Sequence, residues 1–207
     1  MSQFFQIHPD NPQARLVRQA VDIIRGGGVV VYPTDSAYAL GCHIGDKNAL
    51  DRIRRIRKLD ARHNFTLVCR DLSEIATYAK VNNTVYRMLK HATPGPYTFI
   101  LKATSEVPRR LMHAKRKTVG LRVPDNNIAA AIMADLGEPL MSVSLIMPGD
   151  ELPLIDPYEI REVLEHEVDL VIDGGYCGME PTTVVDLADD SPLIMRVGKG
   201  DITPFED

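Results

Sequence analysis

The chain has 207 residues, of which 44% are hydrophobic and 25% charged, and its formal net charge is −4. This length and composition are enough to bury one sizeable core, so we expect a single domain over residues 1–207. Residues 1–5 lack the basic start of a secretory signal, and no apolar run approaches the roughly 20 residues that span a bilayer, so we expect a cytoplasmic protein without a membrane partner.

The first 33 residues predict a helix followed by a buried strand. Asn11 can cap a helix that has Pro12 at its first position and that continues to about residue 26. The helix leads into residues 29–32, a continuous β-branched and aromatic run that is typical of a buried strand. Pro33 cannot donate to a strand ladder, and we expect it to end the strand.

Four polar side chains follow the predicted strand. Thr34, Asp35, Ser36 and Tyr38 offer three hydroxyls and a carboxylate within five positions. Such a cluster at the end of a buried strand is held rigidly enough to meet a ligand. The alternative is a solvated turn, which favours the same residue types.

Helical and strand patterns alternate through the rest of the chain. Asp46 can cap a helix whose last turn is rich in arginine, a charge that the helix dipole favours. Helices are also predicted after Asp71, after Asp156, and over 83–91 and 126–136, and strands over 65–69, 97–102, 117–123, 140–146, 168–172, 183–187 and 193–195. In the helix after Asp156 we expect Ile160, Val163 and Leu164 to face the core. This order predicts an α/β protein with a twisted mixed sheet flanked by helices and a concave basic cleft.

Charges are segregated along the chain. Residues 52–122 contain 17 Lys/Arg and four Asp/Glu, whereas residues 123–207 contain three Lys/Arg and 19 Asp/Glu. This asymmetry favours a polyanionic partner such as a nucleotide or a nucleic acid. Alternatively, the basic side chains solvate helices and pair with the acidic C-terminal third, in surface ion pairs worth about 0–1 kcal/mol each.

Cysteine and histidine spacing gives no sign of a metal site. Three scattered cysteines form neither a disulfide framework nor a Cys-x-x-Cys pair, and the six histidines show no His-x-x-x-His or His-x-Glu spacing. We expect no protein-held metal, and any Mg²⁺ would arrive with a nucleotide. Gly174–Gly178 is not followed by the Lys-Ser/Thr pair of a P-loop.

Several short motifs, in their order, resemble those of the Sua5/YrdC/YciO family. Gly27 and Gly28 precede the first strand, and Tyr32–Asp35 and Tyr38 follow the family pattern. The similarity continues at Pro94–Thr98, Val119–Pro124, Asp173–Gly175, Thr182–Val184 and Arg196–Gly198. It covers nearly the whole chain, is nearest to the YciO branch, and implies a YrdC-like fold.

The resemblance also implies an activity and its site. The best-understood relatives condense L-threonine, bicarbonate and ATP into threonylcarbamoyl-adenylate, a precursor of the t6A modification of tRNA. Positions that match substrate-binding residues, with one arginine for the carboxylate, are Thr34, Arg122, Ser142 and Thr182. Positions that match nucleotide-binding residues are Arg57, Thr118, Ser144 and Arg196, of which Arg57 and Ser144 are the implied catalytic pair.

Two family motifs are incomplete. Leu59 replaces the second cation of the family's Lys-x-Arg motif, and Ile146 replaces the amide of its Ser-x-Asn motif. Each lost charge-assisted hydrogen bond costs roughly 1.5 to 3 kcal/mol, so the two together would lower a rate by about 10² to 10⁴ if they add. Lys58 or Arg62 could restore the charge. Alternatively, Leu59 and Ile146 are core residues in an altered local register.

The basic segment is suited to duplex or otherwise structured RNA. Recognition of such RNA is electrostatic and shape-based, whereas the lack of Trp argues against stacking on single strands. The candidate RNA-binding residues are Arg52, Arg54, Arg55, Lys58, Arg62, Arg109, Arg110, Lys115, Arg116 and Lys117.

Together, these features lead to two hypotheses. The first is a nucleotide-pocket protein that binds tRNA or double-stranded RNA and has weak or altered adenylate chemistry. The second is a working threonylcarbamoyl-AMP synthase with ATP, L-threonine and bicarbonate as substrates. Both use ATP or AMP with Mg²⁺ as a ligand. The segment 105–116 is expected to be the most exposed and mobile loop.

Overall fold

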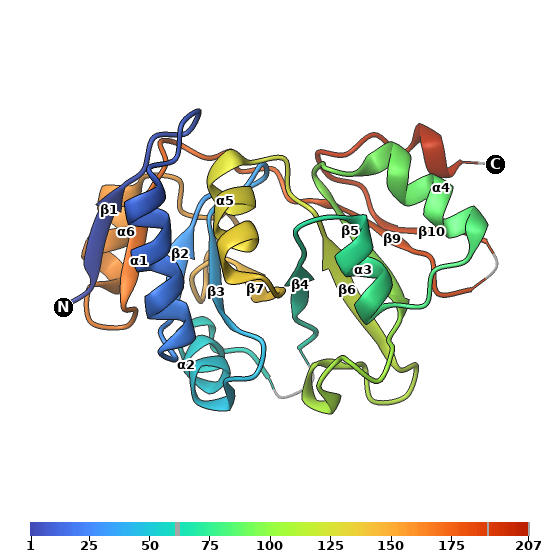
Figure 1. The fold of residues 1–207 in the computed structure, drawn as a ribbon, viewed down its shortest axis with the longest axis horizontal. Helices are drawn as coiled ribbons and strands as arrows, with labels where there is room; N and C mark the ends of the chain where they lie inside the picture. Colours follow the sequence, from blue (N-terminus) through green and yellow to red (C-terminus); the bar gives the residue numbers. More distant parts are fainter. Residues whose placement is uncertain (61–62, 190, 207) are drawn as a thin grey trace.

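The computed structural model describes residues 1–60, 63–189 and 191–206. Within them, one mixed sheet has the strand order β1-β8-β2-β3-β7-β4-β6-β5-β9-β10 (Figure 1). The strands are β1 (Gln3–Gln6), β2 (Val30–Tyr32), β3 (Ala39–His43), β4 (Thr66–Val68), β5 (Tyr97–Lys102), β6 (Thr118–Arg122), β7 (Leu140–Ser144), β8 (Leu170–Asp173), β9 (Thr183–Asp186) and β10 (Leu193–Arg196). The predicted α/β class with a mixed sheet is confirmed.

Helices follow the predicted capping residues at most of their starts. The helices of the described residues are α1 (Ala14–Arg25), α2 (Lys47–Arg57), α3 (Leu72–Tyr78), α4 (Asn83–Ala92), α5 (Asn127–Leu136) and α6 (Pro157–Leu164). Asp46 caps α2 as predicted, because its Oδ1 accepts a hydrogen bond from the N–H of Ala49 at 2.8 Å. None of the described helices is both long and apolar enough to cross a membrane.

The predicted start of α1 is wrong by two residues. Helix α1 begins at Ala14, and the residue before it, Gln13, makes no side-chain cap. Nδ1 of His8 instead accepts hydrogen bonds from the N–H groups of Asp10 and Asn11, each at 3.1 Å. These bonds hold the segment before Pro12 in a turn outside the helix, so Asn11 cannot act as its cap.

Two strands, β1 and β3, escaped the sequence-based assignment, and one core residue was misplaced. Strand β3 pairs with β2 on one side and with β7 on the other, both antiparallel. Val163 was expected to face the core, but it is 48% exposed, while Ile160 and Leu164 form the buried stripe of α6. The remaining predicted strands are present, with ends shifted by one to a few residues.

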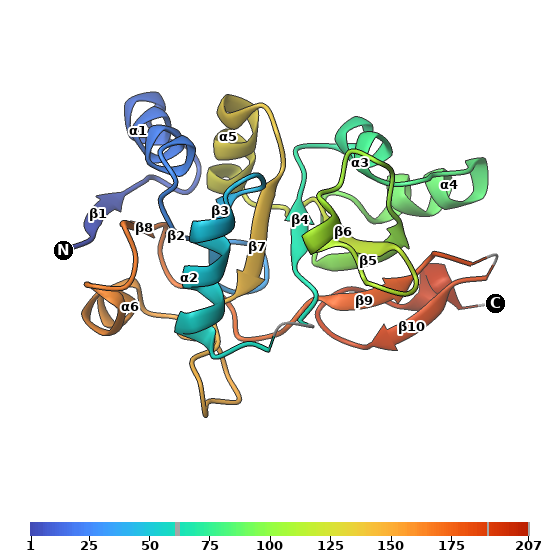
Figure 2. The same ribbon diagram turned by 90° about the horizontal axis from the view of Figure 1, so that it is seen from below.

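The sheet is strongly twisted, and helices cover it unevenly. Helices α1 and α5 lie on one side of β2 and β3, with α2 and α6 on the other side (Figure 2). At the other end of the sheet, Phe99 and Leu101 of β5 belong to the same buried cluster as Ile75 of α3 and Leu89 of α4. The alternate residues of β5 therefore point to the opposite face, and that face carries the candidate site.

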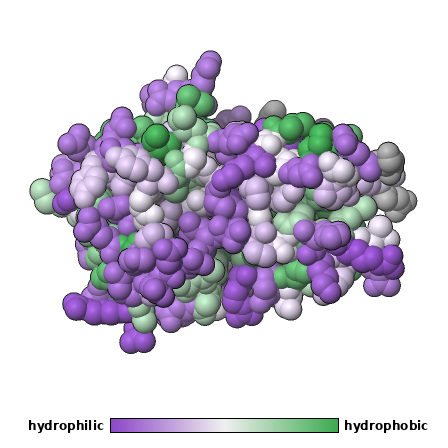
Figure 3. Space-filling model, turned by 90° about the horizontal axis from the view of Figure 1, so that it is seen from above, coloured by the Kyte–Doolittle hydropathy of each residue, from purple (hydrophilic) through white to green (hydrophobic). Residues whose placement is uncertain are grey.

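One surface of the molecule, seen in Figure 3, is largely hydrophilic, with hydrophobic side chains in small separate groups. Such a distribution is ordinary for a protein surface and gives no extended apolar area on this face.

Candidate functional site

A cleft of about 470 Å³ opens over the uncovered face of the sheet. It lies between the C-terminal end of α2, the facing residues of β7, β4, β6 and β5, and the strands β9 and β10. No carboxylate side chain lines it within the described residues. Its charged and hydroxyl-bearing lining residues are Arg57, His63, Thr66, Thr98, His113, Arg116, Thr118, Arg122, Ser142, Ser144, Thr182 and Arg196.

The cleft gathers most of the residues that the family resemblance implied. All four nucleotide-binding candidates line it, as do three of the four substrate-binding candidates, Arg122, Ser142 and Thr182. Register explains how they meet: Ser142 of β7 pairs with Thr66 of β4, which pairs in turn with Gly120 of β6. Positions separated by dozens of residues in the sequence therefore share one floor.

Thr34 is the exception among these candidates. It is 4% exposed and is not among the residues that line the cleft. Its hydroxyl donates to the carbonyl of Ala37 at 2.6 Å and accepts from the N–H groups of Ser36 and Ala37 at 3.2 Å each. A binding role for Thr34 stays a prediction, and on this geometry Thr34 would act by positioning Ala37, which does line the cleft.

Arg122 is held in the cleft wall by a buried network. It forms an ion pair with Asp35, each side chain being 8% exposed, and it also donates to Ser36 Oγ at 3.3 Å. Nε of Arg122 is buried without a hydrogen-bond partner. One edge of the Arg122 guanidinium is used by Asp35, and the edge that includes Nε can still donate hydrogen bonds to an anion.

Hydroxyl groups are organised around the neighbouring arginine. Arg196 donates to the carbonyl of Thr182 at 2.9 Å and to its Oγ1 at 3.1 Å, and Thr182 Oγ1 lies 2.9 Å from Thr98 Oγ1. Burial, with a further contribution from Arg122, lowers the pKa of Arg196. On the floor, Ser142 Oγ lies 2.6 Å from the hydroxyl of Tyr32, whose pKa burial raises to about 12.

Arg57 is the most available cation of the site. It makes no hydrogen bond or ion pair with any residue that the structure describes, and its buried Nε has no partner. Burial lowers its pKa. A partly desolvated guanidinium without a counter-charge favours an incoming anion.

Leu59 and Ile146 differ in their relation to the cleft. Ile146 lines it, so an apolar side chain occupies the cleft wall at the position of the family's amide. Leu59 is not a lining residue and packs, partly buried, against the main hydrophobic cluster. The alternative of a core role therefore fits Leu59 and does not fit Ile146.

Four of the nine RNA-binding candidates that the structure describes are engaged by the protein itself. Arg52 pairs with Asp169 at 2.8 Å, Arg54 with Asp51 at 3.4 Å, and Arg116 with Asp186. Arg110 donates to the carbonyl of Ile44 at 3.1 Å. The exposed candidates that form no ion pair with described residues are Arg55, Lys58, Arg109, Lys115 and Lys117, and Arg62 lies outside the described residues.

The candidates that form no ion pair with described residues come from two segments on the same side of the molecule. Helix α2 and the connection between β5 and β6 both lie at the lower end of the view in Figure 1. The connection is pinned by Arg110 and Arg116 and contains a 3₁₀ turn at Arg109–Leu111. It is thus more ordered than a freely exposed loop.

Sequence reasoning did not single out several lining residues. His63 and His113 showed no motif spacing, and Thr66 and Met195 lie in strands read only as structural. Thr98 lies within a family motif, Pro94–Thr98, and its place in that motif could have identified it as a site residue. No group of three or more His, Cys, Asp or Glu side chains in the described chain could hold a metal ion.

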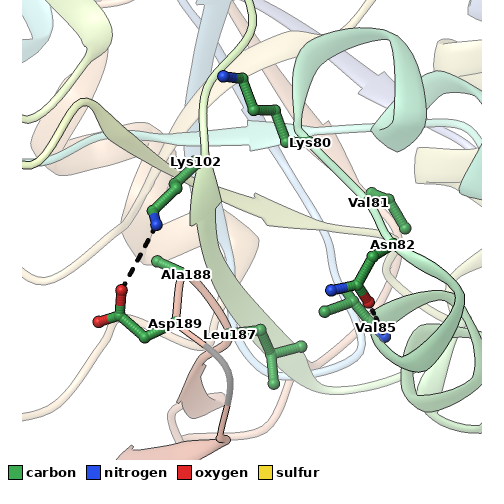
Figure 4. Close-up of a pocket in the computed structure, with 8 residues that line it drawn as sticks. All are labelled: Lys80, Val81, Asn82, Val85, Lys102, Leu187, Ala188 and Asp189. Carbon is green, nitrogen blue, oxygen red and sulfur yellow. Dashed lines mark hydrogen bonds and ion pairs between the residues drawn. The ribbon is translucent and has the colours of Figure 1, made fainter.

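A second hollow, of about 330 Å³, lies beside the start of α4 (Figure 4). Lys102 and Asp189 form an ion pair at 3.5 Å across its wall, and Lys80 points away from that pair. Asn82 is occupied in capping α4. This partly neutralised hollow is separate from the cleft.

The fold and the cleft define an α/β protein of the YrdC-like type. The profile of the Sua5/YciO/YrdC family, which carries the description "Telomere recombination", matches residues 22–198. An uncharacterised protein of Haemophilus influenzae is 65% identical over 206 residues, covering 99% of this chain and all of that protein. The chain belongs to the Sua5/YciO/YrdC family.

Relatives within the family differ in distance. Uncharacterised protein YciO of Escherichia coli is 62% identical over 205 residues, and its crystal structure matches this fold with a TM-score of 0.96 over all of both chains. A threonylcarbamoyl-AMP synthase of Nitrosococcus oceani is 31% identical, covering 76% of this chain and 85% of that protein. The crystal structure of P. abyssi Sua5 complexed with L-threonine is 26% identical, with a TM-score of 0.86 over 95% of this chain and 58% of that chain. These identities agree with the predicted placement near the YciO branch.

Proposed function

We propose that the protein binds an adenosine nucleotide, ATP or AMP with Mg²⁺, in the cleft. The observation that carries the proposal is the convergence of Arg57, Arg122 and Arg196, from α2, β6 and β10, on one cavity. None of the described residues that line this cavity carries a carboxylate. Phosphate oxygens are the ligands that guanidinium groups and hydroxyls recognise best. Since Arg57 has no side-chain partner among the described residues, it is the residue expected to contribute most.

The test is calorimetric titration with ATP and AMP, with and without Mg²⁺. Arg57→Ala removes a charge-assisted contact worth about 1.5–3 kcal/mol, so its affinity should fall about 10- to 150-fold. Arg15→Ala, an exposed change in α1 outside the cleft, is the control and should bind like the wild type. Absence of nucleotide binding, or equal affinity of Arg57→Ala and wild type, would refute the proposal.

The second part of the proposed function is binding of structured RNA, such as tRNA or a duplex, next to the cleft. It is supported by five exposed cations, at the end of α2 and on the β5–β6 connection, that form no ion pair with described residues. Binding of this kind releases counterions, so affinity for an RNA duplex should fall steeply between 50 and about 200 mM salt. Lys115→Ala with Lys117→Ala should lower the slope of log affinity against log salt by up to about two. An affinity that is independent of salt, or no binding, would exclude this part.

A second candidate function is threonylcarbamoyl-AMP synthesis from ATP, L-threonine and bicarbonate. Arg122, Ser142 and Thr182 together in the cleft favour it, as do a relative named for this activity and a family structure complexed with L-threonine. The wild type should then release pyrophosphate only when threonine is present.

A substitution at Ile146 tests whether the protein has weak synthase activity or none. Ile146→Asn restores the family's amide on the cleft wall and should raise threonine-dependent pyrophosphate release. Leu59→Arg should add little by itself, because Leu59 does not line the cleft. If neither the variants nor the wild type exceed a blank without protein, the synthase hypothesis is wrong while nucleotide binding stands on its own titration.

A further inference from the structure

His63 lies in the cleft with Arg57, and its side chain, like that of Arg57, has no polar partner in the described part of the chain. Both side chains line the cavity, and neither forms a hydrogen bond or an ion pair through its side chain with any described residue. The ring of His63 packs edge-on against Phe65, with centroids 5.5 Å apart and planes at 75°. The imidazole is therefore oriented by an apolar contact, and its nitrogens are left for a ligand.

Positive charge surrounds this imidazole. The guanidinium of Arg54 lies over the ring of Phe65, 5.4 Å from its centroid. Arg57 lines the same cleft as His63. Burial is the main factor that lowers the pKa of His63, followed by the charge of Arg57; Asp60 opposes the shift and Arg54 adds to it. The other walls of the cleft contribute Arg116, His113, Arg122 and Arg196 and, among described residues, no carboxylate.

We propose that His63 is a second contact for the anionic group of the ligand, beside Arg57, and that it takes up a proton when that group binds. The proposal rests on the proposed nucleotide function and names a further residue of the same site. An opposite charge within about 4–6 Å favours the charged form of a titratable group. A phosphate bound next to Arg57 and His63 therefore raises the pKa of His63, against the lowering effect of the arginines. The neutral imidazole then becomes an imidazolium that donates a hydrogen bond to the phosphate.

The coupling gives binding a defined pH dependence. Below the pKa of His63 in the free protein, the ring is protonated with or without ligand; above its pKa in the complex, it is neutral in both. Between these two values, binding takes up a proton, and the affinity falls by up to about tenfold per pH unit as the pH rises. Since the free pKa is lowered from 6.5, the affected range begins below pH 6.5.

The experiment is calorimetric titration of AMP into three proteins from pH 5.5 to 8.5: wild type, His63→Gln and His91→Gln. His91 is exposed in α4, does not line the cleft, and serves as the matched control. The phosphate of AMP titrates equally in all three titrations, so the ratio of wild-type to His63→Gln affinity isolates His63. We expect a ratio of about tenfold near pH 6 that falls toward one at pH 8.5.

A second measurement needs no variant. The imidazole C2–H resonance of His63 in wild-type protein should titrate with a pKa below 6.5 without ligand and with a higher pKa when AMP is bound. Identical pH profiles for wild type and His63→Gln, or an unmoved His63 titration in the AMP complex, would overturn the role of His63 while nucleotide binding stands. Failure of AMP to bind at every pH would overturn both, and so separates the two failures.

Discussion

The buried pair of Asp35 and Arg122 provides the most demanding test of the structure. Asp35→Ala leaves a guanidinium with an 8% exposed side chain and no carboxylate beside it. Breaking a buried pair by removal of one partner costs about 3–5 kcal/mol. Asp35 Oδ2 also accepts from the N–H of Asp125 at 2.8 Å, and the loss of that acceptor adds about 1 kcal/mol.

The expected cost of Asp35→Ala is thus about 4–6 kcal/mol, a large part of the 5–15 kcal/mol that stabilises a typical domain. For a chain of this length the melting temperature should fall by about 8–24 °C. Urea unfolding followed by circular dichroism measures the change. Asp51→Ala is the control, since Asp51 is half exposed in a surface pair with Arg54 and should matter by no more than about 1 kcal/mol.

A double-mutant cycle completes this test. Arg122→Met removes the charge and keeps much of the volume, so the double variant Asp35→Ala with Arg122→Met should be less destabilised than the sum of the two single variants. Additive effects would show that the two side chains do not interact. An Asp35→Ala variant within about 1 kcal/mol of wild type would refute the reasoning on burial.

Three further predictions concern pH, capping and close packing. Burial raises the pKa of Tyr32 to about 12, above the roughly 10 of an unfolded chain. The contribution of neutral Tyr32 to the free energy of unfolding is therefore complete below pH 10, and it is lost by about 1.4 kcal/mol per pH unit as the pH rises from 10 to 12. The urea midpoint should fall in that range and fall less in Tyr32→Phe, and a flat wild-type profile would contradict this. Asp46→Ala should cost about 1 kcal/mol in urea unfolding through loss of the α2 cap, whereas Asp46→Asn should be nearly neutral. Gly198→Ala would place Cβ 2.3 Å from the carbonyl oxygen of Pro181, so the backbone next to Thr182 must move; nucleotide affinity should fall with it, and unchanged affinity and stability would contradict the packing.

Local patterns were sufficient for the elements that are dense in one residue type. The β-branched run at 29–32 and the aromatic, aliphatic run at 97–102 became β2 and β5 with nearly the predicted ends. Strand β3, with the sequence Ala-Leu-Gly-Cys-His, has weak strand propensity and exists because β2 and β7 pair with it on both sides. Val163 was misplaced because the buried stripe of α6 runs through Pro157, Ile160 and Leu164, and Val163 lies beside this stripe with 48% of its surface exposed.

Site residues within family motifs could be predicted from the sequence. Those whose role depends on partners distant in the sequence could not. Arg57, Arg122 and Arg196 were expected in the pocket and line one cleft. The engagement of Arg116 could not be read from the sequence, because its partner Asp186 lies 70 positions away. His63 lacked any motif, and only the folded cleft brings it beside Arg57.

Strand β8 lies between two strands, β1 and β2, that are synthesised long before it. Residues 170–173 fill the gap between β1 and β2, with parallel pairs to both. A ribosome that has released the first two-thirds of the protein has therefore exposed two strands whose shared neighbour does not yet exist. Their open edges are the places where a nascent chain would mispair or meet a chaperone. Strand β1 is therefore synthesised before the strand that holds it in the sheet.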